Sequence, residues 1–484
     1  MKRKEIAFLL LLTFAALLVH GYHPAAEDNE IYLPGIIKIL HPSYYPFGRE
    51  FFEPQDRLTL FPHLIAWIVR LTHVPLDWAL FLGQLAAIFL LLMAVWKLSC
   101  RCFPDGAGRW SSVAMVGALL TLPVAGTALY ILDQYLDPRS ISTFAILFAI
   151  DSVLEKRYWR TAFWLTFTAV IHPLMVVFGA GFIVLLLITR KAMPTAEVGW
   201  TALFFPGLGL KAPSAAYWEC LQRRRSFFLL RWHWYEWLGI LGPLALLWWF
   251  SRIAKRMQRP VFEALSRALF FLGLICIAGG LLIATVPSLR VFAAYQPMRG
   301  LQLAYVFLII FSGGLLGESL LKNKPLRWLL LFVPLSAAMC FAQFQLFPGT
   351  RHVEWPGASP INPWEQAFVW IRQNTPEGAI FALDPNYMAL PGENHQGFRA
   401  IAERSRLADV NKDWSVAVLY PWLPLADDCL AQTQAASGWK RLGVADFERL
   451  KKTYGVTWVV LQQPVISGLT CPYQNRAVLV CRVN

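Results

Sequence analysis

Long apolar runs separated by short polar segments constrain this chain of 484 residues more than any other feature. A helix needs about 20 mostly apolar residues to cross the hydrocarbon core of a bilayer. Only 15% of the residues are charged, whereas soluble domains carry about a quarter. The pattern therefore predicts a polytopic α-helical membrane protein with about eleven transmembrane helices. The predicted spans are residues 6–21, 76–98, 112–130, 140–154, 158–172, 173–189, 196–210, 236–251, 263–286, 299–316 and 326–346.

The net charge of +14 does not indicate a nucleic-acid partner, because the basic residues gather in short loops between the apolar runs. An excess of Lys and Arg marks cytoplasmic loops and sets the orientation of a membrane protein. With the basic start MKRK inside, alternation of the spans places five basic loops in the cytoplasm: residues 97–109, 155–157, 190–191, 252–259 and 322–327. We therefore expect a cytoplasmic N-terminus and a periplasmic C-terminus in a bacterial inner membrane.

The first apolar run also resembles a secretory signal, because a basic start precedes an apolar core. The segment HPAAED would then be a weak cleavage site. We favour an uncleaved first helix, because many further spans follow. Either interpretation places Glu27 and Asp28 outside the cytoplasm.

Two domains are expected, a transmembrane helical domain at residues 1–347 and an outer α/β domain at residues 348–484. The first outer loop, residues 22–75, contains two segments that we expect to be surface helices, 31–40 and 58–72. The second of these carries Pro62, His63 and Arg70. The alternative for 58–72 is a true span, which would reverse the topology of everything downstream.

Periodicity changes after residue 347, where turn signals and charges alternate with short β-rich runs. The segment 362–376 predicts an amphipathic helix that ends before Pro376. Strands are predicted at 379–384, 457–461 and 477–481, and a further helix at 446–452. Among the cysteines of this region, Cys429, Cys471 and Cys481, we expect at most one disulfide, and the pairing stays open.

Polar residues converge on the predicted outer face. Glu27 and Asp28 follow the first span, and the other groups lie in later outer loops: Asp133, Asp137 and Arg139; His172; Arg223, Arg224, Arg225, Arg231 and His233; and Arg290, Gln296 and Arg299. Glycosyl transfer from a lipid phosphate needs a general base for the acceptor hydroxyl, which a carboxylate supplies. It also needs positive charge for the phosphate leaving group, and bidentate Arg is suited to this.

The layout resembles the GT-C superfamily of integral membrane glycosyltransferases. Glu27-Asp28 stands where that superfamily has an acid near the start of a long first outer loop, and YLDPRSIS resembles its outer loop after the third span. The stretches NTPEGAIFALDP, FRAIAERS and YGVTWVV are similar to C-terminal domains of bacterial members. The resemblance covers most of the chain and implies a polyprenyl-phosphate-linked sugar as the donor.

The chain departs from the superfamily in two respects. It has no WWD-type motif, and KDWSV at 412–416 is not equivalent, which argues against an oligosaccharyltransferase. No second metal-ligand pair follows the first acid, and Cys100-x-Cys102 has no matching half. A divalent metal ion (Mg²⁺ or Mn²⁺) therefore stays an open alternative.

The resemblance implies that Asp28 is the base or a metal ligand and that Glu27 is its partner. The expected substrate-binding residues are Asp137, Arg139, His172, Arg290, Gln296 and Arg299. Each has an ordinary structural alternative. The acid pair suits a solvated turn, Asp137-Pro138 suits a helix start, Arg139 suits an ion pair with Asp137, His172 suits a turn between spans, and the remaining arginines suit interfacial anchoring.

Three functions remain in view. The first is transfer of a sugar from a polyprenyl-phosphate-linked donor to an envelope acceptor on the outer face. The second is a catalytically inactive GT-C-like protein that serves as a binding or assembly module in envelope polysaccharide biogenesis. The third is a transporter of lipid-linked intermediates, against which the absence of an inverted repeat argues.

Overall fold

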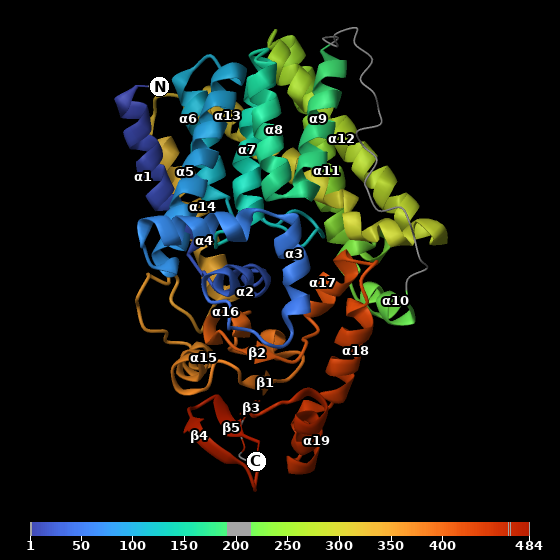
Figure 1. Cartoon of the computed structure of the whole chain (residues 1–484). Coiled ribbons are helices and arrows are strands. Elements are labelled where there is room, and N and C mark those ends of the chain that lie inside the picture. The colour runs from blue at the N-terminus through green and yellow to red at the C-terminus, as the bar shows by residue number, and fades with distance from the viewer. Residues whose placement is uncertain (1, 191–213, 463, 465, 484) are drawn as a thin grey trace. The chain divides into compact units, whose positions relative to one another are not determined.

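The structure, a computed structural model of the chain, describes residues 2–190, 214–462, 464 and 466–483, and Figure 1 shows the course of the chain. The chain is mostly helical. Its internal contacts define two compact units. Unit 1 comprises Met1–Gly21, Leu82–Gly209 and Arg225–Ala342, and unit 2 comprises Tyr22–Phe81, Leu210–Arg224 and Gln343–Asn484. Unit 2 thus joins the predicted first outer loop to the C-terminal residues, and the domain boundary after residue 347 stays a prediction.

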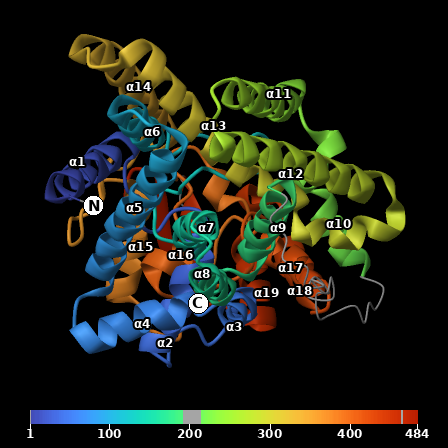
Figure 2. The same ribbon diagram turned by 90° about the horizontal axis from the view of Figure 1, so that it is seen from above.

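Unit 1 is a helical assembly in which α7 is the most enclosed element. Every residue of α7 is buried, and Figure 2 shows it beside α8 and α9. The helices of unit 1 are α1 (Arg3–His20), α5 (Leu76–Cys102), α6 (Gly106–Ala118), α7 (Pro138–Leu154), α8 (Tyr158–Ile171), α9 (Pro173–Thr189), η3 (Arg225–Phe227), η4 (Leu229–Arg231), α11 (Trp234–Arg256), α12 (Pro260–Thr285), η5 (Pro287–Tyr295), η6 (Pro297–Gly300), α13 (Leu301–Leu316), the π-helical turn η7 (Gly317–Leu321) and α14 (Pro325–Leu346). The first turns of α5 and the last turn of α14 belong to unit 2.

Five helical stretches within the described residues are long and apolar enough to cross a membrane. They are α5, α11, α12, the continuous stretch Pro297–Leu321 and α14. This finding supports a membrane-embedded protein. The other described candidates overlap helices of 13 to 18 residues, in full or in part. The predicted span at 196–210 lies outside the described residues. The total of eleven crossings stays a prediction.

The predicted span at 112–130 is wrong, because α6 ends at Ala118. Pro123 lacks an amide hydrogen and cannot continue a helical ladder. The chain folds back instead, with a bridge between Pro123 and Tyr130 and a 2.8 Å hydrogen bond from the Val124 amide to the Leu129 carbonyl. Ala125 and Ala128 adopt left-handed backbone conformations in this turn.

Unit 2 combines helices with a five-stranded sheet. Its elements confirm the helices predicted at 31–40, 58–72, 362–376 and 446–452. The helices are α2 (Asn29–Leu40), η1 (Arg49–Phe51), α3 (Glu53–Leu58), α4 (Phe61–Thr72), α10 (Ala215–Gln222), α15 (Pro363–Asn374), η8 (Tyr387–Ala389), α16 (Phe398–Ala402), α17 (Asp413–Leu419), α18 (Leu425–Ala435), η9 (Trp439–Arg441) and α19 (Val444–Tyr454). The strands are β1 (Ile380–Ala382), β2 (Ser405–Arg406), β3 (Trp458–Gln462), β4 (Thr470–Gln474) and β5 (Val478–Arg482).

The sheet has the order β2-β1-β3-β5-β4. β1 is parallel to β2 and to β3, with Phe381 opposite both Arg406 and Trp458. β5 runs antiparallel between β3 and β4. The strands predicted at 379–384, 457–461 and 477–481 are therefore confirmed as β1, β3 and β5.

Side chains that alternate along the strands build two cores, one on each face of the sheet. Phe381 and Val460 pack with Phe368 of α15 and Phe398 of α16 on one face. The opposite face carries Leu461 and other residues that pack with Phe447 and Leu450 of α19. Because helices cover both faces, the inner strands β1, β3 and β5 are largely apolar.

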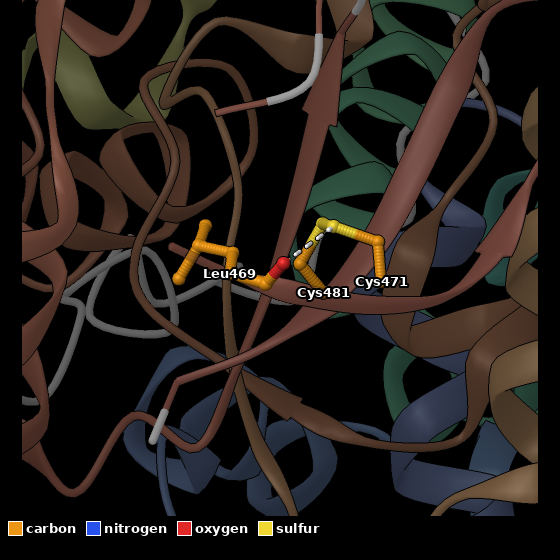
Figure 3. The surroundings of a disulfide bond; sticks show 3 residues. All are labelled: Leu469, Cys471 and Cys481. Carbon is orange, nitrogen blue, oxygen red and sulfur yellow. Dashed lines mark hydrogen bonds between the residues drawn. A yellow bond between two sulfur atoms is a disulfide. The ribbon is translucent and has the colours of Figure 1, made fainter. Parts of the chain in front are cut away.

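One disulfide joins β4 to β5, between Cys471 and Cys481 (Figure 3). The Cys471 sulfur lies 4.0 Å from the carbonyl oxygen of Leu469. Cys429 is a buried free thiol. The expectation of at most one bridge in this region is confirmed, and the pairing that the sequence left open is settled.

Candidate functional site

The acid pair Glu27-Asp28 occupies the turn that leads into α2, within unit 2. The turn is closed by a 3.2 Å hydrogen bond from the Ala26 amide to the His23 carbonyl and by a 2.6 Å bond from the Asn29 side-chain amide to the Pro24 carbonyl. Glu27 has a φ of +53°, in the left-handed region. Such a conformation costs free energy for a residue other than glycine and is found preferentially at functional sites.

A second left-handed segment lies against this turn. Asn394 and His395 have φ values of +63° and +58°. The Glu27 amide donates to the His395 carbonyl at 2.9 Å, and the His395 Nδ1 lies 3.4 Å from the Glu27 Oε1. The Gly397 amide donates to the Ala25 carbonyl at 2.8 Å, and the missing Cβ allows this approach, because a Cβ atom there would lie 3.0 Å from that carbonyl oxygen. Two strained backbone segments, far apart in sequence, are thus held together.

Lys412 joins the two acids from the buried side. Its Nζ donates to the Asp28 Oδ1 at 2.9 Å and also to the Glu27 Oε2. The Lys412 side chain is 11% exposed, whereas those of Glu27 and Asp28 are 37% and 33% exposed. Burial lowers the pKa of the Lys412 ammonium, but the carboxylates of Asp28 and Glu27 outweigh burial and raise this pKa above its usual value. The site therefore presents two carboxylates to solvent over a fixed positive charge.

Asp409 fixes the backbone that carries Lys412. Its Oδ1 accepts from the Lys412 amide at 2.5 Å and from the Asp413 amide at 3.3 Å. Lys412 is the residue before α17, Asp413 is the first residue of that helix, and neither amide has an intrahelical acceptor, so the Asp409 carboxylate caps them. Asp409 therefore positions the Lys412 ammonium through the backbone, without contacting the ammonium itself.

A buried ion network lies behind this cap. Arg406 donates to Glu30 at 2.7 and 3.0 Å, to Asp413 at 2.9 Å and also to Asp409. Arg399 donates two hydrogen bonds to Asp413, of 2.7 and 3.1 Å. None of these five side chains is more than 1% exposed. Removing one partner from such a network leaves an uncompensated buried charge, which costs about 3–5 kcal/mol.

The charges of the network shift one another's pKa values. Burial lowers the pKa of Arg406, but the carboxylates of Asp409 and Asp413 outweigh burial and hold it well above its usual value. Burial raises the pKa of Glu30, and Arg406 and Arg399 offset that rise only in part. For Asp413, burial raises the pKa, yet the two arginines outweigh burial and keep this group ionised.

Arg224 approaches the same loop from the segment after α10. Its Nη2 donates to the carbonyls of Val410 and Asn411, each at 2.7 Å. The guanidinium of the neighbouring Arg223 stacks over Trp414 at 4.6 Å. Both arginines therefore brace the loop that carries Lys412. Arg225 belongs to unit 1 and pairs with Glu236 at 2.7 Å.

Unit 2 also holds acids whose pKa is raised by burial. The His23 Nδ1 lies 2.7 Å from the Glu354 Oε1, and burial lowers the pKa of His23 to about 3. Burial raises the pKa of Glu354, and burial together with Glu354 raises that of Glu365. Glu393, whose pKa is also raised by burial, accepts from the Gln396 amide at 3.1 Å. Through this hydrogen bond, Glu393 holds the left-handed segment Asn394-His395 that faces Glu27.

The other sequence-predicted site residues lie in unit 1. Asp137 caps α7, because its Oδ1 accepts from the Ser140 amide at 2.7 Å. Arg139 donates to Asp133 at 2.7 and 2.9 Å and pairs with Asp137 at 3.1 Å. The capping and ion-pair alternatives noted for Asp137 and Arg139 are therefore present.

Six further residues of the predicted outer-face set also belong to unit 1. His172 separates α8 from α9, Arg290 lies in η5, Gln296 joins η5 to η6, and Arg299 lies in η6. Arg231 ends η4, and His233 precedes α11. Of the predicted catalytic and substrate-binding residues, only Glu27 and Asp28 belong to unit 2; Arg223 and Arg224 of the wider outer-face set also lie there. The substrate-binding roles of Asp137, Arg139, His172, Arg290, Gln296 and Arg299 stay predictions.

The donor set at the acid pair does not fit a bound divalent metal. Among the described residues, no group of three or more His, Cys, Asp and Glu side chains is arranged to hold an ion. Glu27 and Asp28 face the Lys412 ammonium instead, and this fixed positive charge repels a divalent cation at the same carboxylates. We therefore derive no step through Mg²⁺ or Mn²⁺.

Sequence reasoning missed the partners of the acid pair. Lys412, Arg406 and Asp409 belong to the segment 398–414, FRAIAERSRLADVNKDW, in which charged residues recur among small apolar ones. Charged residues are rarely buried unless paired, so this mixture could have indicated an ion network. Glu30, two residues after Asp28, is fully buried in the same network.

No protein-family model matches the chain, and no curated protein matches it.

Proposed function

We propose that the protein is a membrane glycosyltransferase with a GT-C-like architecture. It would transfer a sugar from a polyprenyl-phosphate-linked donor to an envelope acceptor on the outer face of a bacterial inner membrane. The observation that carries this proposal is the exposed pair Glu27-Asp28, held over the buried Lys412 ammonium by two strained backbone segments. Its position directly after α1, an apolar helix, agrees with a donor that arrives from the lipid phase.

Asp28 acts as the general base in this proposal. The acceptor hydroxyl oxygen forms a bond to the anomeric carbon of the sugar while its proton passes to the Asp28 carboxylate. The bond between that carbon and the phosphate oxygen breaks, and the electron pair leaves with the polyprenyl phosphate. A positioned carboxylate of this kind contributes roughly 100- to 10,000-fold to the rate.

Glu27 and Lys412 position the base. Lys412 keeps one Asp28 oxygen in a fixed direction through the 2.9 Å hydrogen bond, and Glu27 shares the same ammonium. Positioning of a base within a few tenths of an ångström preserves the effective concentration of the reacting groups. Arg290 and Arg299 are the residues expected to contact the donor phosphate.

A second candidate function is a catalytically inactive GT-C-like protein that binds or assembles envelope polysaccharide. The Lys412 bridge favours this inactive protein in one respect, because the ammonium neutralises the carboxylates of Glu27 and Asp28, one of which would have to accept a proton in catalysis. Transport of a lipid-linked intermediate stays a third, less favoured candidate.

Donor turnover distinguishes these candidates. The purified protein would be placed in lipid nanodiscs with a panel of polyprenyl-phosphate-linked hexoses, pentoses and amino sugars, together with an envelope extract as the source of acceptor. Release of polyprenyl phosphate and appearance of a glycosylated product support the transferase. Binding of a donor without any release across the panel would overturn it in favour of the inactive protein.

A further inference from the structure

A cavity of about 1,210 Å³ lies within unit 1, between the first turns of α1, the start of α6 and the junction of η7 with α14. We propose that this cavity binds the headgroup of a membrane phospholipid that carries both a phosphate and a primary ammonium, as phosphatidylethanolamine does. This site is independent of the sugar transfer proposed above.

The walls of the cavity point to a lipid. Trp110 and Trp328 line it, and tryptophan rings favour the headgroup level of a bilayer. α14 packs loosely, because among its residues only Gln343 is buried. Leu329, which also lines the cavity, is 60% exposed. The cavity thus adjoins a helix whose apolar face is suited to acyl chains.

The phosphate would bind among three positive features, which offset the carboxylates of Glu5 and Asp105 that also line the cavity. Lys4 and Lys322 line the cavity, are exposed, and make no ion pair with the residues that the structure describes. The third feature is the start of α6, where the Asp105 side chain makes no capping hydrogen bond. A Cβ atom added at Gly106 would meet nothing within 4 Å. Open amides at a helix start and adjacent lysines are suited to a phosphate.

The ammonium would bind at Glu318. One oxygen of this carboxylate accepts from Arg259 at 2.6 Å, while the Oε1 is buried and has no hydrogen-bond partner among the described residues. The side chain is 9% exposed and lines the cavity. A buried acceptor without a donor is costly, and a primary ammonium supplies three donors.

The local backbone is shaped around this carboxylate. Glu318 lies in η7, a π-helical turn, and such turns are frequent at functional sites. A Cβ atom at Gly108 would lie 2.8 Å from the Glu318 Cγ, so glycine makes room for the side chain. The arrangement discriminates between headgroups, because a phosphatidylcholine ammonium has no N–H to donate and phosphatidylglycerol has no ammonium.

Lipid titration of the full-length protein tests the proposal. After delipidation in detergent, the protein would receive phosphatidylethanolamine, phosphatidylglycerol or phosphatidylcholine, with retained lipid measured by native mass spectrometry and the melting temperature measured in parallel. We expect phosphatidylethanolamine to bind roughly five- to tenfold more tightly than either alternative, as is typical of a few charged contacts. Equal retention of the three lipids, or preference for phosphatidylglycerol, would overturn the proposal.

Variants locate the site. Lys322→Ala should weaken phosphatidylethanolamine binding about fivefold, whereas Lys324→Ala, a loop lysine that does not line the cavity, should leave it unchanged. Glu318→Gln should reduce the preference for phosphatidylethanolamine over phosphatidylcholine. If a variant fails to fold, the headgroup series on the unaltered protein still decides. Equal effects of Lys322→Ala and Lys324→Ala would contradict the assignment.

Discussion

The ammonium of Lys412 donates a hydrogen bond to the Asp28 carboxylate at 2.9 Å, across 384 positions of sequence. This bond joins the turn before α2 to the start of α17, two segments of unit 2. The Lys412 side chain is largely buried, whereas the Asp28 side chain is partly exposed. The carboxylate therefore faces solvent and the ammonium lies beneath it.

Replacement of Lys412 by Met should destabilise unit 2. The variant keeps the length of the side chain but removes the ammonium from which Glu27 and Asp28 both accept hydrogen bonds. We expect a loss on the order of 1–3 kcal/mol, because the contact is only partly buried, measured as the free energy of unfolding in detergent. Lys452→Met, at an exposed position of α19, is the matched control. Equal stability of the two variants would show that Lys412 does not hold the acids.

The buried network predicts a larger effect. Arg406→Met removes the hydrogen bonds to Glu30, Asp409 and Asp413, and we expect a loss of about 3–5 kcal/mol. Arg372→Met, which removes an arginine that is 42% exposed and paired with Glu403, should cost less than about 1 kcal/mol. Thermal unfolding followed by intrinsic fluorescence checks both values, and similar melting temperatures for the two variants would contradict the network.

The close approach of Gly397 to Glu30 and Ala25 can be tested by adding a Cβ atom at this position. A Cβ atom there would lie 2.6 Å from the Glu30 Oε2 and 3.0 Å from the Ala25 carbonyl oxygen. Gly397→Ala should therefore destabilise the protein by about 1–3 kcal/mol through overpacking. Gly378→Ala, where a Cβ atom would meet nothing within 4 Å, should be neutral or stabilising. Equal melting temperatures for the two alanine variants would contradict this close approach at Gly397.

Asp56 predicts a pH dependence. Burial and then Glu53 raise the pKa of this carboxyl to about 8, and a Cβ atom at Gly35 would collide with it. The folded protein keeps a proton that the unfolded chain releases between about pH 4 and pH 8, so this contribution to stability is lost as the pH rises through that window.

Asp56→Asn removes this titration. The stability of the unaltered protein should fall relative to that of the variant between about pH 5 and pH 8.5, by on the order of 3 kcal/mol. Asp384→Asn, at a surface turn of unit 2, controls for the general effect of pH. Parallel pH profiles of the unaltered protein and Asp56→Asn would refute the raised pKa.

Local patterns in the sequence predicted several elements because each depends on near neighbours. The period of α15 and the β-branched runs of β3 and β5 are legible in short windows. Asp137-Pro138 likewise indicated a helix start, and α7 begins there. β2 has only two residues, too few for a periodic signal.

The partners of the acid pair could not be predicted in the same way. The contact between Lys412 and Asp28 depends on how distant segments fold together, which no local pattern encodes. The predicted span at 112–130 was wrong although its hydropathy is high, because α6 ends at Ala118 and Pro123 prevents a helix from running through the rest of the segment. High hydropathy is found both in segments buried inside a protein and in segments exposed to lipid, so it does not distinguish a buried turn from a membrane span.

Sugar transfer by Asp28→Asn tests the central claim most directly. The variant would be compared with the unaltered protein and with Asp428→Asn, an exposed position of α18, in nanodiscs that contain a polyprenyl-phosphate-linked sugar accepted by the unaltered protein. The account predicts that Asp28→Asn lowers transfer by at least about 100-fold, as expected for loss of a general base, while Asp428→Asn stays near the unaltered rate. Full transfer by a folded Asp28→Asn protein would contradict the account.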